Sequence, residues 1–362
     1  MAVHTTLDTL IQRVMEENER KFDLLADTRR MSVTPFSERP ADDHDAEWER
    51  GVTLDIDQPS GITTLDMTDH ALGQMATDLE IPMRYFRKMR NDAPGLFQTN
   101  VHHWLHNTPK RKLVRAYKGE PEVARAWLSD RYRRLDNIEI ATKLLPVFDK
   151  LGTEVTFHNA AITDTKFYVR ALFPRMEGEV KVGDPVQWGV QIKNSEVGDG
   201  QFDISNFVMR LICINGMVVA KVMSARHVGK RLGESLSDEA IRADDKAFWL
   251  AARDELQASV SEERFNEVLT TLRGTTDGAR ITAPIAATER IAKTFSLSDG
   301  EKEAVLLNLA SGGDTTRWGA LNAVTAAAKS SESFDRRVEM EELGWSMAEM
   351  SEKEWGRIAV PA

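Results

Sequence analysis

Apolar residues near the start of the chain recur with the spacing of one face of an amphipathic helix. They are Leu7, Leu10, Ile11, Val14 and Met15, and Phe22 and Leu25 extend the same face. The following stretch, residues 34–61, mixes prolines and acidic residues with little periodicity, which predicts a loop. We therefore expect residues 1–64 to form an N-terminal helix and an irregular acidic arm.

Two short helices are predicted next. Thr68 or Asp69 can cap a helix that runs through Leu79, and Pro82 suits the first position of a second helix. The second helix carries four basic side chains: Arg84, Arg87, Lys88 and Arg90. The pair therefore resembles a helix-turn-helix, whose second helix enters the major groove of DNA. The alternative is a purely structural pair, because any helical hairpin gives the same pattern.

From residue 112 onward, apolar and polar residues alternate with the period of a β-strand. The predicted strands span residues 112–118, 123–129, 154–158, 166–173, 186–193, 201–214 and 217–223. In the clearest of them Trp188, Val190 and Ile192 alternate with polar residues, so we expect one buried and one solvent-exposed sheet face. Asn215-Gly216 predicts a type I′ hairpin turn, and residues 194–200 predict a second hairpin. With a helical run over 138–148 to cover the sheet, residues 65–235 form an α+β core.

Beyond residue 235 the pattern is helical to the end of the chain. Helical periodicity covers residues 247–256, 265–272, 285–295, 302–309 and 317–328. Ser298 and Glu301 form a capping box at the start of one of these helices. The predicted fold class is therefore α+β: a mainly antiparallel sheet with covering helices, followed by a helical C-terminal region over residues 236–362.

Charge is distributed unevenly along the chain. With 47 Lys and Arg against 57 Asp and Glu, the net charge is −10, which on average repels phosphate backbones. Residues 84–134, in contrast, hold 13 basic and four acidic residues, a net +9. Two acidic stretches, residues 38–57 and 332–354, hold eight acids each. We expect a polarised molecule with one basic region between acidic ends.

The sequence lacks the motifs of several enzyme classes. It contains no glycine-rich phosphate loop, no Gly-x-Ser-x-Gly elbow, no His-Glu-x-x-His helix and no Cys-x-x-Cys pair. We therefore expect no catalytic residue of these classes, no cofactor and no metal site. The single cysteine, Cys213, has apolar neighbours, which predicts a buried thiol. The longest apolar stretch, residues 211–220, is far shorter than the roughly 20 residues of a membrane span, and the N-terminus lacks the pattern of a signal peptide, so a cytoplasmic protein without a membrane partner is expected.

Two polar clusters keep a metal site open as an alternative. His102 and His106 would share a helix face at i, i+4 and could supply two ligands. Residues 194–203 crowd the oxygen donors Asn194, Glu196, Asp199 and Asp203 into one loop, which could suit Mg²⁺ or Ca²⁺. In both cases we favour a structural interpretation, a surface or core-edge helix for the histidines and a self-satisfied hairpin turn for the loop.

The basic region interleaves cations with aromatic rings, the combination that binds single-stranded nucleic acid through phosphate contacts and base stacking. The candidate binding residues are Lys110, Arg111, Lys112, Arg115, Lys118, Arg125, Trp127, Arg131, Tyr132, Arg133 and Arg134. Alternation is expected to place Arg125 and Trp127 on one strand face. The alternative interpretation sets Trp127 in the core and pairs the arginines with Asp130 and Asp136.

Four stretches together resemble the family that carries domain of unknown function 932, known from phage- and plasmid-borne proteins. They are RAWLSDRYRRLDN (125–137), NSEVGDG (194–200), MRLICINGM (209–217) and ALNAVT (320–325). Trp127 and Ile214 depart from the residues that are usual at those positions. The resemblance covers residues 65–330 and brings no catalytic residues. It implies a mobile-element origin, in the cytoplasm of a bacterial host.

Charge, aromatic residues and resemblance together favour a non-enzymatic protein that binds single-stranded DNA, as an annealing or recombination accessory of a phage or prophage. Phage annealing proteins also combine a curved sheet with covering helices and assemble as oligomers, so a homo-oligomer is expected by analogy of fold. Two alternatives stay open. The loop at residues 194–203 would suit a metal-dependent enzyme acting on nucleic acid or a nucleotide, and the acidic stretches would suit a protein-interaction module that inhibits a host protein.

Overall fold

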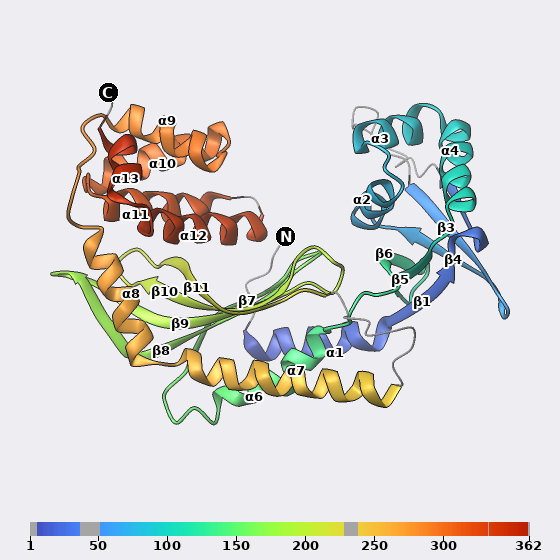
Figure 1. Ribbon diagram of the computed structural model, residues 1–362, viewed down its shortest axis with the longest axis horizontal. Coiled ribbons are helices and arrows are strands. Elements are labelled where there is room, and N and C mark those ends of the chain that lie inside the picture. Colours follow the sequence, from blue (N-terminus) through green and yellow to red (C-terminus); the bar gives the residue numbers. More distant parts are fainter. Residues whose placement is uncertain (1–5, 37–50, 228–237, 332, 361–362) are drawn as a thin grey trace.

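The computed structural model describes residues 6–36, 51–227, 238–331 and 333–360. Its two β-sheets belong to two lobes that lie side by side (Figure 1). We call the lobe around the six-stranded sheet the small lobe and the lobe around the five-stranded sheet the large lobe. The predicted α+β class is confirmed, because all strand pairs but one are antiparallel, helices cover both sheets, and the C-terminal region is helical.

The small lobe contains six strands in the order β1-β5-β6-β4-β3-β2. They are β1 (Lys21–Asp27), β2 (Met31–Phe36), β3 (Gly51–Gln58), β4 (Gly61–Met67), β5 (Arg111–Tyr117) and β6 (Val123–Ser129). The prediction of an irregular arm is therefore wrong for the described residues before 65. The predicted helical face also ends earlier, because Phe22 and Leu25 belong to β1. Most of the first acidic stretch, residues 38–50, lies outside the described residues.

Three helices cover one face of this sheet: α2 (Asp69–Asp78), α3 (Met83–Asp92) and α4 (Pro94–Asn107). Along β3, Val52, Leu54 and Ile56 are buried beneath them while the alternate residues are not. The rings of Phe86 on α3 and Phe97 on α4 meet edge to face with centroids 4.8 Å apart. The two helices predicted on either side of Pro82 are thus present, as part of the covering layer of the small lobe.

The large lobe is built on a sheet whose strands follow one another in sequence. They are β7 (Thr156–Ile162), β8 (Phe167–Lys181), β9 (Asp184–Asn194), β10 (Phe202–Arg210) and β11 (Asn215–Ala225). The hairpin predicted around residues 194–200 is confirmed, since Lys193 on β9 lies opposite Asp203 on β10.

The β10–β11 hairpin is also present, but its turn is displaced from the predicted position. Asn215 pairs with Arg210 inside the ladder, and the turn occupies residues 211–214, where Ile214 adopts a φ of 51°. The turn carries Cys213, whose side chain is exposed rather than buried as predicted. The Asn-Gly pattern predicts positive φ at Asn215 and Gly216, whereas in the structure Ile214 has it.

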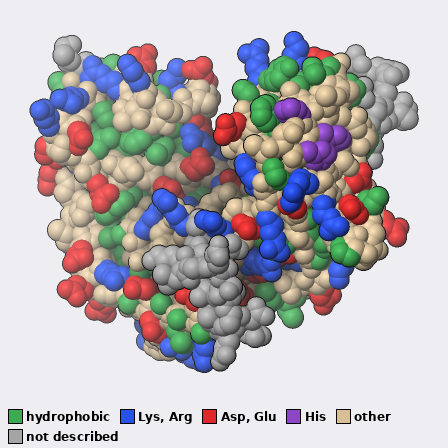
Figure 2. Space-filling view, turned by 45° about the vertical axis from the view of Figure 1, so that its right-hand side comes forward, with side chains coloured by type: hydrophobic (Ala, Val, Ile, Leu, Met, Phe, Trp, Pro, Cys, Tyr) green, Lys and Arg blue, Asp and Glu red, His purple; other side chains and the backbone are tan. Residues whose placement is uncertain are grey.

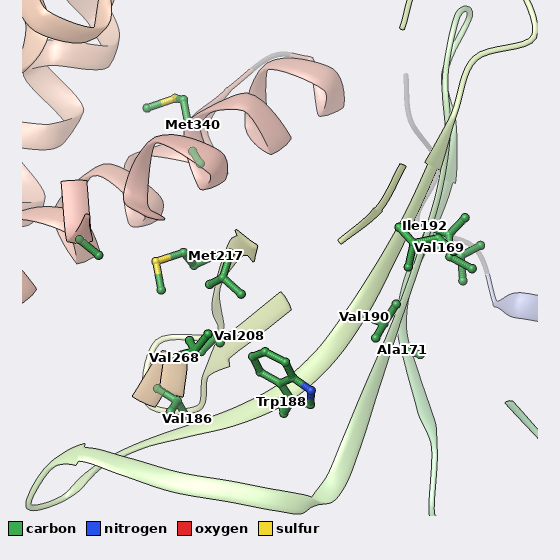
Figure 3. Packing of buried hydrophobic residues seen from close by; sticks show 14 of the residues in the cluster. Val169, Ala171, Val186, Trp188, Val190, Ile192, Val208, Met217, Val268 and Met340 are labelled. Carbon is green, nitrogen blue, oxygen red and sulfur yellow. The ribbon is translucent and has the colours of Figure 1, made fainter. Parts of the chain in front are cut away.

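One face of the large sheet packs against helices that precede and follow it in sequence. These are α1 (Leu7–Arg20), α5 (Asn137–Glu139), α6 (Leu145–Phe148), α7 (Asp238–Ser259) and α8 (Glu262–Gly274). Trp188 on β9 is fully buried in this layer together with Val190 and Ile192 (Figure 3). Its indole N–H donates to the Ser259 carbonyl at 3.1 Å, and its ring lies 5.5 Å from that of Phe265. The predicted apolar face of β9 is therefore the core face.

The opposite face of β9 was predicted to be exposed to solvent, and this prediction is wrong. The helix α12 (Phe334–Ala348) covers it, and Gln191 is 1% exposed. The polar groups are matched across the layer: Arg170 donates to Gln191 at 2.7 Å and to Glu341 on α12, and Lys193 donates to Glu342 at 3.0 Å. The polar residues on this face of β9 therefore contact charged residues of α12 rather than solvent.

The remaining helices form the layer that includes α12: α9 (Pro284–Phe295), α10 (Asp299–Gly312), α11 (Arg317–Ala327) and α13 (Glu352–Ala359). The capping box predicted at Ser298 and Glu301 is confirmed at the start of α10. Of the two predicted domain boundaries, the one between residues 64 and 65 falls inside β4. The one between residues 235 and 236 lies outside the described residues.

Candidate nucleic-acid interface

Arg115, at the centre of β5, points inward to the junction between the two lobes. Arg115 is 2% exposed. Its guanidinium donates to Asp23 at 3.0 Å and to the Glu196 carbonyl at 3.0 Å, and it pairs with Asp136 at 2.7 Å. Burial opposes the charged form, but the surrounding carboxylates outweigh it and raise the pKa of Arg115. The charge of Arg115 is therefore neutralised inside the protein.

Glu196 is the anion at the centre of this junction. It lies in the β9–β10 turn, is 3% exposed, and accepts from Lys21 at 2.7 Å, from Arg125 at 2.8 Å and from the backbone N–H of Asn137 at 2.7 Å. Burial would raise the pKa of this carboxyl group, but the adjacent Lys21 and Arg125 cations lower it to about 2. The turn of the large lobe is thus fastened to β1 and β6 of the small lobe through buried ion pairs.

A shift in register separates Arg125 from Trp127. Arg115 pairs with Ala126 and the next residue of β5 pairs with Ala124, so Arg125 has no partner in the ladder. Arg125 consequently faces the junction, whereas Trp127 joins the core beneath α2. The prediction that the two side chains share one face is wrong because of this bulge.

Trp127 is held in place by a charged group on α2. The side chain is 3% exposed, and its indole N–H donates to Asp78 at 3.2 Å. Lys112 and Lys110 also pair with Asp78, at 2.9 and 3.1 Å. Burial opposes ionisation of Asp78, but the hydrogen bond from Lys112 and its positive charge lower the pKa of that carboxyl group. The structure thus has Trp127 in the core, as in the alternative interpretation.

The remaining candidates divide into paired and exposed side chains. Arg133 pairs with Asp245 at 2.9 Å, Arg134 pairs with Asp23 at 3.1 Å, and the Tyr132 hydroxyl donates to the Ser195 carbonyl at 2.9 Å. Three of the eleven candidates are exposed and have no ion-pair partner among the described residues: Arg111, Lys118 and Arg131. The structure therefore does not gather the eleven residues on one surface.

The helix α3 presents three further exposed cations of the basic region. Arg84, Arg87 and Lys88 are exposed and have no carboxylate partner in the described part of the chain. Arg90 differs, because it is buried and donates to Asp69 at 3.3 Å. Tyr85, on the same helix, is 47% exposed and follows Arg84 directly, but it lines a different hollow from Arg87.

A groove of about 1020 Å³ runs between the lobes along α2 and α3. The small lobe contributes residues from α2, α3, β5 and β6, and the large lobe contributes the β9–β10 turn and the end of β11. In Figure 2 a hollow separates the lobes, and Lys and Arg side chains lie on the surface of the small lobe beside it. Two cations line the groove without an ion-pair partner among the described residues: Arg87 from the small lobe and Arg226 from the large lobe.

The carboxylates that line the groove are already neutralised. Asp69 is paired with Arg90, and Asp78 is paired with Lys110 and Lys112. The groove thus combines two unpaired arginines with acids whose charge is balanced within the small lobe. Such a surface attracts anions without an opposing local charge.

Two rings of the groove wall lie one on the other. Tyr132 and His227 stack with centroids 5.0 Å apart and an interplanar angle of 2°. Burial raises the pKa of Tyr132 and lowers the pKa of His227, so both rings are neutral near pH 7. His70 and Gln74 approach the Val197 carbonyl at 2.9 and 2.6 Å, which fixes the β9–β10 turn against α2.

The polar clusters that could have held a metal are used within the protein. Asp199 accepts from Thr165 at 2.6 Å and pairs with Lys166, whereas Asp203 lies 3.7 Å from Lys193. His102 accepts from the Val33 backbone N–H at 2.8 Å, and His106 lies 3.0 Å from the Met31 carbonyl, so both bind β2. Across the described residues, no group of three or more His, Cys, Asp or Glu side chains is arranged to hold a metal ion.

Neither of the two unpaired cations of the groove was among the predicted binding residues. Arg87 was counted in the basic region but assigned only to a helix-turn-helix pattern, and Arg226 lies far outside that region. The usable signal was at Arg87 itself, because no acidic residue stands three or four positions before or after it on the helix. Nothing in the local sequence around Arg226 distinguishes it.

Comparison with known proteins gives a family but no function. A family model described as Domain of unknown function (DUF932) matches residues 126–342, more than half of the chain. No match was found among curated proteins or among solved structures. Within the described residues, every helix is too short or too polar to span a membrane.

Proposed function

Since the chain belongs to the DUF932 family, whose description assigns no activity, we propose from the groove itself that the protein binds a strand of nucleic acid between its lobes. Arg87 and Arg226 contact phosphates from opposite lobes, and the other cations of α3 extend the path along the small lobe. The role is that of a non-enzymatic binding protein. The resemblance to proteins carried by phages and plasmids favours DNA as the strand.

One observation supports this proposal above all others. Within the described part of the chain, Arg87 and Arg226 have no ion-pair partner, although each acid in the groove lining has one. Arg115 on β5, in contrast, is paired with the carboxylates of Asp23 and Asp136. Phosphates are the ligands that such unpaired guanidinium groups bind best, because the planar fork matches two phosphate oxygens.

A single strand suits the surface better than a duplex. The ring of Tyr85 is exposed on the same helix as Arg84 and Lys88, and stacking on exposed rings requires unpaired bases. Within the groove wall itself, Trp127 and His227 are buried, and the half-buried ring of Tyr132 is stacked on His227. We therefore expect binding that tolerates many sequences.

The test uses fluorescence anisotropy of the full chain with labelled single-stranded and duplex oligonucleotides at about 50 mM salt, where phosphate contacts are strongest. The Arg87→Ala/Arg226→Ala double variant is expected to bind the single strand at least about tenfold more weakly, because it loses two phosphate contacts. Arg111→Ala is the matched control: this exposed arginine belongs to the basic region but lies outside the groove.

Three results would overturn the proposal. Absence of binding by the unmodified chain would remove the function altogether. Equal affinities of the double variant and of Arg111→Ala would move binding away from the groove. Preference for the duplex over the single strand would contradict the assignment of the strand type.

A further inference from the structure

A second cavity lies within the large lobe and shares no lining residue with the groove. It has a volume of about 270 Å³ and is lined by the β10–β11 turn, the end of α10 and one side of α11. Leu309, Ala323 and Ala326 give it apolar walls, and Asn215, Asn308 and Asn322 give it three carboxamides. A concave site with mostly apolar walls and a few placed polar groups is typical of small-molecule binding.

Two of the four stretches that carry the family resemblance meet at this cavity. MRLICINGM contributes Arg210, Cys213 and Asn215, and ALNAVT contributes Asn322 and Ala323. These stretches are more than a hundred residues apart in sequence. The proposed groove uses neither of them, so they call for a separate explanation.

Asn215 carries an unmet hydrogen-bonding group in the cavity wall. Its side chain is 3% exposed, and no described residue donates a hydrogen bond to its Oδ1 atom. Buried amide oxygens in folded proteins nearly always accept a hydrogen bond. The missing donor is therefore expected from a molecule that enters the cavity.

The charged residues of the cavity restrict the nature of that molecule. Arg210 forms a two-fold ion pair with Asp184, with donor–acceptor distances of 2.6 and 2.8 Å, and Lys181 pairs with Asp314 at 2.6 Å. These charges balance within the protein, which disfavours a strongly charged ligand. The Nη1 group of Arg210 has only the weak acceptor Cys213 Sγ, at 3.6 Å, and so can still donate to a neutral acceptor.

From these contacts we infer that the cavity binds a small, uncharged molecule with a planar amide-like edge, in which an N–H group lies beside an acceptor atom. Asn215 Oδ1 accepts from the N–H group, and a carboxamide N–H or Arg210 donates to the acceptor. Nucleobases and primary carboxamides share this edge, and asparagine pairs with it in two-fold fashion on adenine. The inference is independent of nucleic-acid binding in the groove.

Cys213 provides a direct measurement, because it lines the cavity, is exposed and is the chain's only cysteine. Alkylation by iodoacetamide, followed by the intact mass of the full chain, therefore reports on this site alone. One arm adds adenosine, guanosine, cytidine or uridine, and the other adds nicotinamide, a primary carboxamide without charged groups. At concentrations well above Kd, a molecule from one arm is expected to slow alkylation about tenfold by mass action.

Two variants test the mechanism of protection. Asn215→Leu removes the amide at similar size, so protection is expected to disappear while the melting temperature stays equal or rises, since an unpaired buried polar group is lost. Ala326→Leu fills the cavity from α11 without changing Asn215 and is also expected to abolish protection. Asn266→Leu, at an exposed position on α8, is the matched control and should be protected like the unmodified chain.

Two outcomes would overturn the inference. One is that no compound from either arm slows the alkylation of Cys213. The other is that Asn215→Leu, whose melting temperature shows that it is folded, is protected from alkylation as well as the control variant.

Discussion

Replacing Glu196 with glutamine tests whether buried ion pairs fasten the two lobes. The substitution keeps the shape of the side chain but removes its charge, which leaves Lys21 and Arg125 buried without an anion. Removing one member of a buried pair typically costs about 3–5 kcal/mol, because the partner charge loses its compensation. We expect Glu196→Gln to fall in this range.

The pKa of Glu196 gives a second route to the same magnitude. Folding lowers it from 4.5 to about 2, and each unit corresponds to about 1.4 kcal/mol, so the ionised carboxylate contributes about 3 kcal/mol. A depressed folded-state pKa means that this contribution is fully present above pH 4.5 and is lost as the pH falls toward 2. The stability of the unmodified chain should therefore decline across this window, and Glu196→Gln should decline less.

The assay is urea unfolding at several pH values between 3 and 7, followed by tryptophan fluorescence. Glu342→Gln is the control, because Glu342 forms a partly exposed pair with Lys193, for which about 0–1 kcal/mol is expected. If Glu196→Gln at pH 7 costs no more than Glu342→Gln, or if its unfolding keeps the full acid dependence, the reasoning about the junction is refuted.

Three further predictions concern the framework and are checked by thermal or urea unfolding. Gly198→Ala should destabilise the β9–β10 turn by at least about 1–2 kcal/mol, because Gly198 has a φ of 78° and an added Cβ would lie 2.6 Å from Leu128; an unchanged midpoint would contradict this. Trp188→Ala should cost about 3–5 kcal/mol through the cavity left in the core, and a smaller loss would mean that the layer collapses around it. Ser298→Ala should cost about 1 kcal/mol by removing the cap of α10, whereas no effect would show that the cap is dispensable.

The early strands of the small lobe show where the sequence was informative and was misinterpreted. Val52, Leu54 and Ile56 alternate strictly and are all buried in β3, so the period of a strand was present. Asp55 and Asp57, on the other face, together with nearby prolines gave the stretch the composition of a loop. Periodicity was the better guide, because an antiparallel sheet that packs one face on the core tolerates charged residues on its other face.

The ion-pair partners of the arginines on β5 and β6 could not be predicted from local sequence. Arg115 finds Asp23 at a separation of 92 residues, and Arg125 finds Glu196 at a separation of 71. The first pair depends on β1 pairing with β5 and the second on how the lobes dock, and no pattern of one segment encodes either. The bulge that turns Arg125 away from Trp127 is likewise invisible in the alternation of residues on β6.

The number of unpaired cations sets how steeply binding should depend on salt. For a single strand, the slope of log K against log salt is about −0.7 per neutralised phosphate. The nine Lys and Arg candidates of the basic region would give a slope of about −6. Arg87 and Arg226 in the groove with Arg84 and Lys88 on α3 would give about −3, since Arg115 and its neighbours are already neutralised by carboxylates. Anisotropy titrations from 50 to 300 mM salt separate the two values, and a slope near −6 would mean that binding extends beyond the groove and α3 to the cations of the basic strands.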